Sequence, residues 1–226
     1  SDEEDGECFQ ADLQSVKESI MSFAAGSASG MDGFRPQFFK DLISKSAGNY
    51  GEEALSAITK LCNYMLLGKV NNSICKYIYG ASLCALNKKG GGIRPIAIGI
   101  ALRRLVSKLC CAHVRDDLGD YLRPKQIGFG TPQGCEAGVH ATRTYAEHKK
   151  NLSKILLKID YQNAFNSFER DALLTQVRTV TPSLFKYLWQ CYANTTYLSF
   201  NSVIIDSQVG AQQGDPTGPL TFCLAI

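Results

Sequence analysis

Residues 154–165 read Lys-Ile-Leu-Leu-Lys-Ile-Asp-Tyr-Gln-Asn-Ala-Phe, a short apolar run that ends in an acid. The run predicts a buried strand over residues 154–160, with Asp160 at its carboxyl end, and a helix over about residues 163–179. A carboxylate on rigid backbone is well placed for catalysis, because magnesium prefers one or two carboxylates together with substrate phosphate oxygens. Alternatively, Asp160 only caps the helix that follows it.

Helices and two hairpins are predicted on either side of this stretch. Helical spacing and capping predict helices over about residues 9–24, 36–43, 52–67, 102–118, 135–149, 183–193 and 215–226. Two apolar runs at residues 81–86 and 93–98 flank a glycine turn and predict a β-hairpin. A second hairpin is predicted over residues 197–209, with Asn201 and Ser202 at its turn. The expected fold class is therefore α+β, with helices dominant and antiparallel hairpins inserted.

Composition describes an ordinary folded protein. The chain has 226 residues, 45% of them hydrophobic, which is enough for one sizeable core or two closely joined subdomains. No apolar run approaches the roughly 20 residues that a membrane helix needs, so no membrane partner is expected. The nine cysteines form no Cys-x-x-Cys pair, which argues against structural zinc. We expect reduced thiols and an intracellular location, in the cytoplasm and nucleus.

Positive charge is concentrated in the middle of the chain. The net charge is only +3, but residues 69–170 contain 17 Lys or Arg against 7 Asp or Glu. A basic middle in a nearly neutral chain indicates a polyanionic partner such as nucleic acid. The alternative is a solvated surface that happens to be basic.

Five ordered segments resemble motifs of reverse transcriptases. They are GSASGMDGFRPQFF (26–39), NKKGGGIRPIAI (87–98), QIGFGTPQGCEAGVH (126–140), IDYQNAFNSF (159–168) and QVGAQQGDPTGP (208–219). The first resembles the opening segment of non-long-terminal-repeat, LINE-like retrotransposon enzymes. The fourth and fifth resemble the first acidic motif and the Gln-Gly motif. One segment alone would be weak support, whereas five in the right order make a specific resemblance.

The resemblance implies a right-hand polymerase architecture. Residues 1–8 would be an acidic tail, residues 9–150 the fingers and the fingers–palm connection, and residues 151–226 a partial palm. Complete family members carry a second acidic motif, with adjacent aspartates, after the Gln-Gly helix. The only such pair here, Asp116-Asp117, comes too early. We therefore expect the chain to be truncated before that motif and inactive alone.

The acidic motif implies metal and sugar recognition. By resemblance, Asp160 is the catalytic metal carboxylate and the Tyr161 carbonyl a second ligand, with two magnesium ions in the complete enzyme. Ala164 and Phe165 would lie in the nucleotide site. The Phe165 ring would exclude a 2′-hydroxyl and so select deoxynucleotides. Without the resemblance, Phe165 would be read as a core aromatic.

The hairpin and the Gln-Gly motif imply the remaining contacts with the nucleotide. Lys88, Lys89 and Arg94 would hold the triphosphate, although an ordinary basic turn has the same composition. Gln213 and Gly214 would lie beside the nascent base pair, where a glycine allows close backbone approach. Asp215, although acidic, sits beside Pro216 and is expected to start a helix rather than bind metal.

Three basic residues on the predicted helix over 102–118 are candidates for template contacts. Arg103, Arg104 and Lys108 could contact phosphates, or they could form a solvated face. The expected partners are an RNA template, a DNA primer, deoxynucleoside triphosphates and the remainder of a parent polyprotein.

Three functional interpretations follow from the sequence. The chain is a piece of a retroelement RNA-directed DNA polymerase, or a catalytically dead nucleic-acid-binding module, or an assembly module that forms a homodimer through an exposed partial palm.

Overall fold

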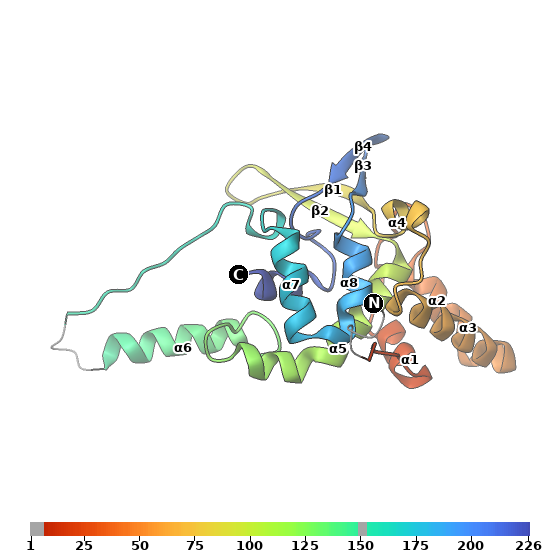
Figure 1. Cartoon of the computed structure of the whole chain (residues 1–226), viewed down its shortest axis with the longest axis horizontal. Helices are drawn as coiled ribbons and strands as arrows, with labels where there is room; N and C mark the ends of the chain where they lie inside the picture. Colours follow the sequence, from red (N-terminus) through yellow and green to blue (C-terminus); the bar gives the residue numbers. More distant parts are fainter. Residues whose placement is uncertain (1–6, 149–152) are drawn as a thin grey trace.

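The computed structural model describes residues 7–148 and 153–226. Most of the predicted acidic tail, residues 1–6, and the predicted boundary between residues 150 and 151 lie outside the described residues. In the described part, helices form most of the body and a four-stranded mixed sheet lies along one side of it (Figure 1). The expected mixture of helices and strands is confirmed at this level.

Within the described residues, four helices precede the sheet, and local signals set several of their ends. They are α1 (Leu13–Met21), α2 (Pro36–Leu42), α3 (Gly48–Leu66) and α4 (Asn72–Ile78), with a 3-10 turn at Lys45–Ala47 between α2 and α3. Pro36 is the first residue of α2, where its missing N–H costs nothing. Gly68 adopts a φ of 66° and closes the end of α3. The predictions missed α4, which Asn71 caps by accepting a hydrogen bond from the Ser73 amide.

The sheet consists of two antiparallel hairpins joined side by side. β1 (Ala81–Asn87) pairs with β2 (Ile93–Gly99), and β3 (Thr196–Phe200) pairs with β4 (Val203–Ser207), in the order β2-β1-β3-β4. The two hairpins meet through a short parallel pairing, Ala81 with Leu198 and Ser82 with Ser199. Both hairpins were predicted, and Asn201 and Ser202 have the positive φ angles that a two-residue turn requires. The parallel pairing between them was not predicted.

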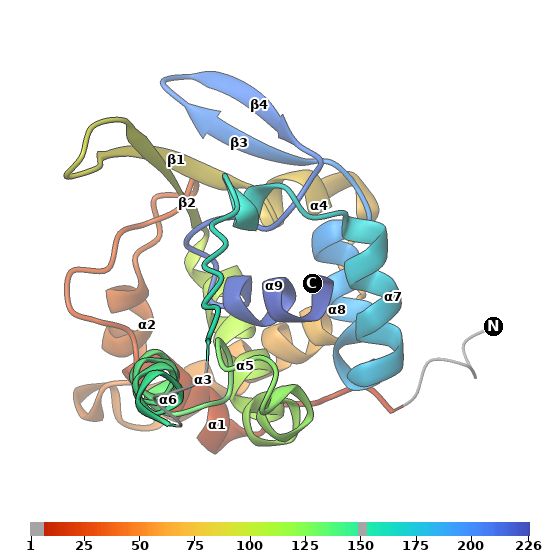
Figure 2. The same cartoon turned by 90° about the vertical axis from the view of Figure 1, so that its left-hand side faces the viewer.

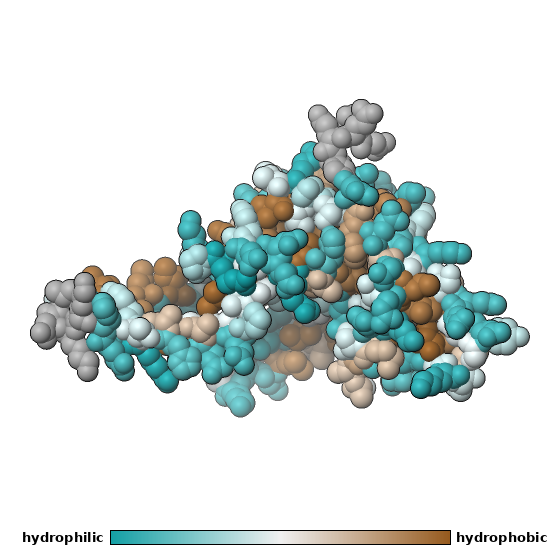
Figure 3. All heavy atoms as spheres, turned by 90° about the horizontal axis from the view of Figure 1, so that it is seen from below, coloured by the Kyte–Doolittle hydropathy of each residue, from teal (hydrophilic) through white to brown (hydrophobic). Residues whose placement is uncertain are grey.

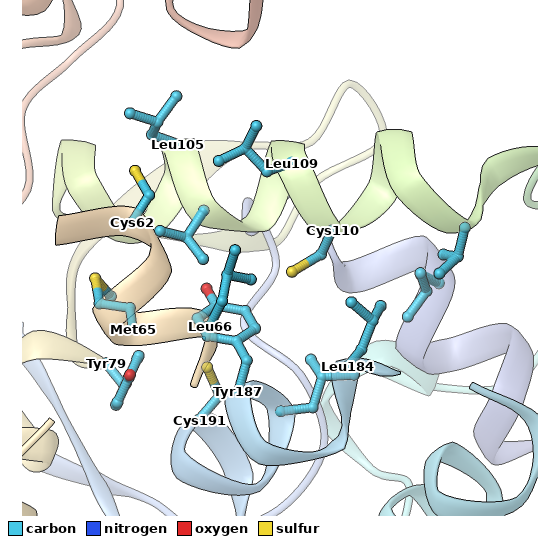
Figure 4. Packing of buried hydrophobic residues seen from close by; sticks show 14 of the residues in the cluster. Cys62, Met65, Leu66, Tyr79, Leu105, Leu109, Cys110, Leu184, Tyr187 and Cys191 are labelled. Carbon is cyan, nitrogen blue, oxygen red and sulfur yellow. The ribbon is translucent and has the colours of Figure 1, made fainter. Parts of the chain in front are cut away.

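Helix α5 (Ala101–Leu122) runs through the centre of the core. Its buried Leu105, Leu109 and Cys110 face residues of α3 and α8 (Phe185–Tyr192), among them Leu66 and Tyr187 (Figure 4). Helix α9 (Gly218–Ala225) packs between α5, α8 and α7 (Arg170–Val180), where Figure 2 shows it near the centre of the view. The packing forms one continuous hydrophobic cluster across these helices.

A protruding arm extends from this body. We define the arm as α6 (Gly134–Glu147) together with the described residues 153–161, which run back toward the body without regular secondary structure (Figure 1). Lys154 holds the two parts of the arm together, because its Nζ donates to the carbonyls of Tyr145, Ala146 and His148 at the end of α6.

The predicted buried strand over residues 154–160 is wrong for this structure. Ile155, Leu156, Leu157 and Ile159 are 62–86% exposed, and no strand of the described residues pairs with them. An apolar run becomes a strand only when a neighbouring strand accepts and donates its backbone hydrogen bonds. Figure 3 shows hydrophobic surface on the arm. The helix predicted over residues 163–179 also begins later, at Arg170, after a 3-10 turn at Ala164–Asn166.

No helix of the described residues is both long enough and apolar enough to cross a membrane.

Candidate active site

A cleft of about 580 Å³ lies between the tip of the β1–β2 hairpin and the turn that follows the arm. It is lined by Lys88, Ile93, Arg94, Pro95, Asp160, Tyr161, Asn163, Ala164, Phe165, Asn166 and Gln213. These residues come from three segments that are far apart in the sequence. Seven of the residues singled out from the sequence line this one cleft, namely Lys88, Arg94, Asp160, Tyr161, Ala164, Phe165 and Gln213.

The hairpin supplies the positive charge of the cleft. Arg94 stands opposite Leu86 in the β1–β2 register, and the turn between the strands uses Gly91 and Gly92 at positive φ. Both glycines occupy a backbone conformation that side chains disfavour, and the Lys88 amide closes the turn on the Gly92 carbonyl at 3.0 Å. Among the described residues, no ion pair involves Lys88 or Arg94, so both charges are available to an anion. Lys89 lies at the exposed tip, outside the cleft lining.

Asp160 ends the exposed part of the arm and faces the same cleft. Its carboxylate and the neighbouring Tyr161 are both exposed, and the chain then turns at Asn163, which has a φ of 52°. Within residues 7–148 and 153–226, no three His, Cys, Asp or Glu side chains gather closely enough to hold a metal ion. Asp160 and the Tyr161 carbonyl offer oxygen ligands of the kind that magnesium prefers, and an ion held there would need its other ligands from substrate phosphate and water. Asp160 is the one acidic residue among the described residues that line this cleft.

Phe165 has one side in the cleft and the other against the core. Its ring stacks on Phe222 of α9 at 4.8 Å between centroids and 17° between planes. Its carbonyl accepts a 2.7 Å hydrogen bond from the Ala211 amide. The stacking therefore restrains the ring position, and Phe165 is both a packing residue and a cleft residue.

The loop over residues 208–217, which we call the Gln-Gly loop, lies against β2. The Ala97 amide donates a 2.7 Å hydrogen bond to the Gln213 carbonyl. Gly214 has a φ of 125°, and a Cβ there would come within 2.5 Å of the Ala97 carbonyl oxygen. The close approach that requires a glycine at position 214 is thus made with β2 of the same chain.

Asp215 is buried and does not face the cleft. Its Oδ2 pairs with Arg103 Nη2 at 2.6 Å, and its Oδ1 accepts from the Thr217 amide at 2.9 Å and Thr217 Oγ1 at 2.8 Å. The helix predicted to start at Asp215 begins later, at Gly218 with Thr217 as its N-cap, so Asp215 lies in the loop just before α9 and holds Thr217.

Arg103 corrects a prediction. It was expected to contact template phosphates, but it is only 1% exposed, so a phosphate cannot reach its guanidinium. Burial, the largest single influence, would lower the pKa of Arg103, but the Asp215 carboxylate together with Cys191, Tyr192 and Tyr187 raises it above its ordinary value. The sequence offered no local sign of this burial, because Asp215 is more than a hundred residues away.

Arg104 and Lys108 lie on the half-buried side of α5. Arg104 donates to the Ala28 carbonyl at 2.7 Å, and Lys108 donates to Ser22 Oγ at 3.0 Å. Both cations lie over the Phe23 ring. Burial lowers the pKa of each, and the Arg104 charge further lowers that of Lys108. Their expected contact with template phosphates stays a prediction.

Two buried polar residues beside the site were missed by the sequence analysis. Arg170 donates to the Gly210 carbonyl at 3.0 Å and to the Ser207 carbonyl at 2.9 Å. Gln212 donates to the Tyr79 carbonyl at 2.9 Å. Nothing in the local sequence distinguishes either residue from an exposed one, because the Ser207 and Tyr79 carbonyls that they bind lie 37 and 133 residues away.

Comparison with known families gives one match. Residues 86–226, more than half of the chain, match the family model described as reverse transcriptase (RNA-dependent DNA polymerase). A comparison with curated proteins gave no match.

Proposed function

Because the chain belongs to the reverse transcriptase family, we propose that it is part of an RNA-directed DNA polymerase that acts on an RNA template, a DNA primer and deoxynucleoside triphosphates. One observation carries the proposal. The cleft brings together a basic hairpin tip, a carboxylate and an aromatic ring from separate segments. A nucleotidyl transferase uses basic side chains to bind the phosphates, a carboxylate to bind metal, and an aromatic ring to distinguish deoxyribose from ribose.

Each side chain has a distinct task in this proposal. Arg94 and Lys88 bind the triphosphate, since guanidinium gives a bidentate grip and ammonium a mobile point charge. Lys89, at the hairpin tip, approaches the phosphates only if the tip bends inward. Phe165, restrained by Phe222, excludes a 2′-hydroxyl and so favours deoxynucleotides. Ala164 leaves space beside that ring.

Gln213 and Gly214 form the remaining wall of the proposed nucleotide site. Gln213 lines the cleft, and its backbone is held to β2 by the Ala97 amide. Gly214 allows that close approach. The incoming base would therefore contact Gln213 and Gly214, whose position is fixed by their contacts with β2.

Asp160 and the Tyr161 carbonyl would hold magnesium. When bound, the ion supplies charge stabilisation to the attacking and leaving oxygens of phosphoryl transfer. Since the described residues place one carboxylate at the cleft, we propose that this chain binds nucleotide but does not extend a primer alone.

We also propose the finer assignments. Residues 9–150 would be fingers and their connection to the palm, and residues 151–226 a partial palm. The parent would be a LINE-like retroelement polyprotein, a proposal that rests on the resemblance of residues 26–39 to the opening segment of such enzymes. Gly30 in this segment packs against the backbone of Ile100, between β2 and α5. A Cβ at position 30 would come within 2.6 Å of that backbone, so the position requires a glycine.

Nucleotide binding by residues 1–226 on an RNA–DNA primer–template tests the proposal. Arg94→Gln should weaken deoxynucleotide binding about 10- to 100-fold, because a charge-assisted hydrogen bond contributes about 1.5–3 kcal/mol. Arg143→Gln on exposed α6 is the matched control and should change binding less than about two-fold. Equal losses in both variants, or no binding by the wild-type chain, would contradict the proposal.

Sugar selection gives a second test. Phe165→Ala should admit ribonucleotides while leaving primer–template binding unchanged, and Phe200→Ala on the β3–β4 hairpin is its control. An unchanged preference for deoxynucleotides in Phe165→Ala would remove the sugar-sorting role.

Primer extension with magnesium tests the metal assignment. We expect no primer extension by residues 1–226. Asp160→Ala removes the proposed metal ligand, and Asp171→Ala removes a carboxylate outside the cleft lining as its control. Extension that only Asp160→Ala abolishes would mean that a second copy, or another group of this chain, completes the metal site.

A second candidate function, an assembly module, is favoured by the exposed apolar residues of the arm. Ile155 and Leu157 are 86% and 77% exposed, and such a run is suited to pairing with another strand. Sedimentation across a concentration series separates the candidates. Dimerisation that Leu157→Lys abolishes, without any nucleotide binding, would favour assembly over polymerisation.

A further inference from the structure

A buried polar network lies directly behind the Gln-Gly loop. We propose that Arg103, acting with Gln212 and Asp215, is a positioning group that holds Gln213 against β2 and thereby sets the wall of the nucleotide cleft. The inference rests on the proposed function for its catalytic meaning, whereas the ordering of the loop is a property of this chain alone.

Arg103 is the centre of the network. Its Nη1 donates to Gln212 Oε1 at 2.6 Å and to the Tyr79 carbonyl, while its Nη2 pairs with Asp215 Oδ2 at 2.6 Å. The Arg103 and Asp215 side chains are 1% and 3% exposed. A buried guanidinium is costly to desolvate, and its geometry must satisfy several acceptors at once. Arg103 therefore ties two positions of the loop to α5.

The loop residue that lines the cleft stands between these two anchors. Gln212 also donates to the Tyr79 carbonyl at 2.9 Å, and Asp215 accepts from Thr217, so the positions on both sides of Gln213 are held. Gln213 in turn accepts from the Ala97 amide at 2.7 Å. β2 is an edge strand, and this bond satisfies an amide on its free edge. Loss of the anchors would release the Gln213 carbonyl from the strand that carries Arg94.

A second buried arginine fixes the start of the same loop. Arg170 donates through Nε to the Gly210 carbonyl at 3.0 Å, and through Nη1 and Nη2 to the Ser207 carbonyl and Oγ at 2.9 and 2.8 Å. The Ala211 amide then bonds the Phe165 carbonyl. The loop thus connects the Phe165 turn to β2. Arg103 fixes the part of the loop that contacts β2.

A purely stabilising role and a positioning role predict different behaviour. Replacing both members of a buried ion pair with apolar residues of similar size is often neutral for stability, whereas removing one member leaves an unpaired charge. Apolar side chains cannot donate hydrogen bonds to Gln212 and to the Tyr79 carbonyl. A stable double variant would therefore still lose the contacts that fix the position of the Gln-Gly loop against β2. The double variant therefore separates the two roles.

The experiment compares wild-type residues 1–226 with Arg103→Met, the double variant Arg103→Met/Asp215→Leu, and Arg143→Met on exposed α6 as control. Three quantities are measured for each: the melting temperature, the exchange rate of the Ala97 and Gln213 amides by NMR, and deoxynucleotide affinity on an RNA–DNA primer–template. We expect the double variant to melt closer to wild type than the single variant. Its Ala97 amide should exchange at least about 10-fold faster and its deoxynucleotide Kd should rise about 10-fold, with primer–template affinity unchanged.

Each outcome decides the proposal. Recovery of nucleotide affinity to within two-fold of wild type in the double variant would show that Arg103 only stabilises the fold. An unchanged Ala97 exchange rate in both variants would overturn the positioning role directly. If the wild-type chain binds no nucleotide, the proposed function fails. The exchange rate then decides the positioning role on its own, since faster exchange supports it and unchanged exchange overturns it.

Discussion

The two sides of the cleft are built in opposite ways. The Gln-Gly loop is anchored by two buried arginines and by backbone hydrogen bonds to β2 and to the Phe165 turn. The arm that delivers Asp160 has exposed apolar side chains, and the described residues give it no pairing strand. The difference shows that contacts within this chain hold the Gln-Gly loop in place, whereas the described residues give the segment that carries Asp160 no comparable buried anchor.

Amide hydrogen exchange should give the largest contrast, between the arm and helix α5, to which Arg103 anchors the Gln-Gly loop. Amides of residues 154–161 should exchange at least about 1,000-fold faster than those of Leu105 and Leu109 in α5. Unpaired amides open at almost no free-energy cost, whereas core amides open at a cost that approaches global unfolding. Mass spectrometry after peptide digestion measures both. Protection of the arm within ten-fold of α5 would mean that the arm already has a partner, such as a second copy.

Replacing one leucine of α5 and one leucine of the arm with alanine compares how much each element contributes to the free energy of unfolding. Leu105→Ala should lower the free energy of unfolding by about 2–5 kcal/mol, because Leu105 is fully buried and a cavity remains. Leu157→Ala should change it by less than about 0.5 kcal/mol, because Leu157 is 77% exposed. Urea denaturation followed by circular dichroism measures both values. A large loss from Leu157→Ala would show that the arm packs in solution.

Cysteine reactivity offers a probe that needs no change in the packing. Burial raises the pKa of Cys110 well above its usual value and that of Cys191 to about 12, so their thiolates are scarce at neutral pH. Cys135 on the arm and Cys84 on β1 are exposed. At pH 8, iodoacetamide should modify the exposed pair at least about 100-fold faster. Equal rates under native conditions would contradict the packing around α5.

The smallest expected effect concerns the contact that holds the arm together. Lys154→Ala removes the cation that caps the carbonyls at the end of α6, which should cost α6 about 0.3–1 kcal/mol. Faster exchange of the amides in the last turn of α6 is the measurement. Lys158→Ala, in the same exposed segment, is the matched control, and an equal effect from both would remove the capping role.

Sequence predicted the parts of this molecule that local signals determine. Pro36 and Gly68 mark helix ends, and glycines or Asn-Ser mark both hairpin turns, because each residue restricts or permits its own backbone angles. Seven of the predicted site residues also line one cleft. Their assignment depended on motif order, which carries long-range information that spacing alone lacks.

Two features could not be predicted for the same physical reason. The run over residues 154–160 has the composition of a strand, yet a strand depends on a neighbour that no local pattern specifies. Arg103 and Arg104 are adjacent and chemically identical, yet only Arg103 is buried, because Asp215 and Gln212 meet it in space. Both outcomes are set by contacts between segments that are distant in sequence.

The joint between the two hairpins is short, and Arg94 lies far from it along β2. β1 and β3 share only the pairs Ala81–Leu198 and Ser82–Ser199, and Ala81 is paired with Gly99 at the base of β2. Arg94 lies five residues farther along β2. At about 3.3 Å per residue it stands about 17 Å from the joint, so a tilt of about 10° there would displace it by about 3 Å. The hydrogen bond from the Ala97 amide to the Gln213 carbonyl lies between the joint and Arg94, so this one contact limits how far a tilt can carry the guanidinium.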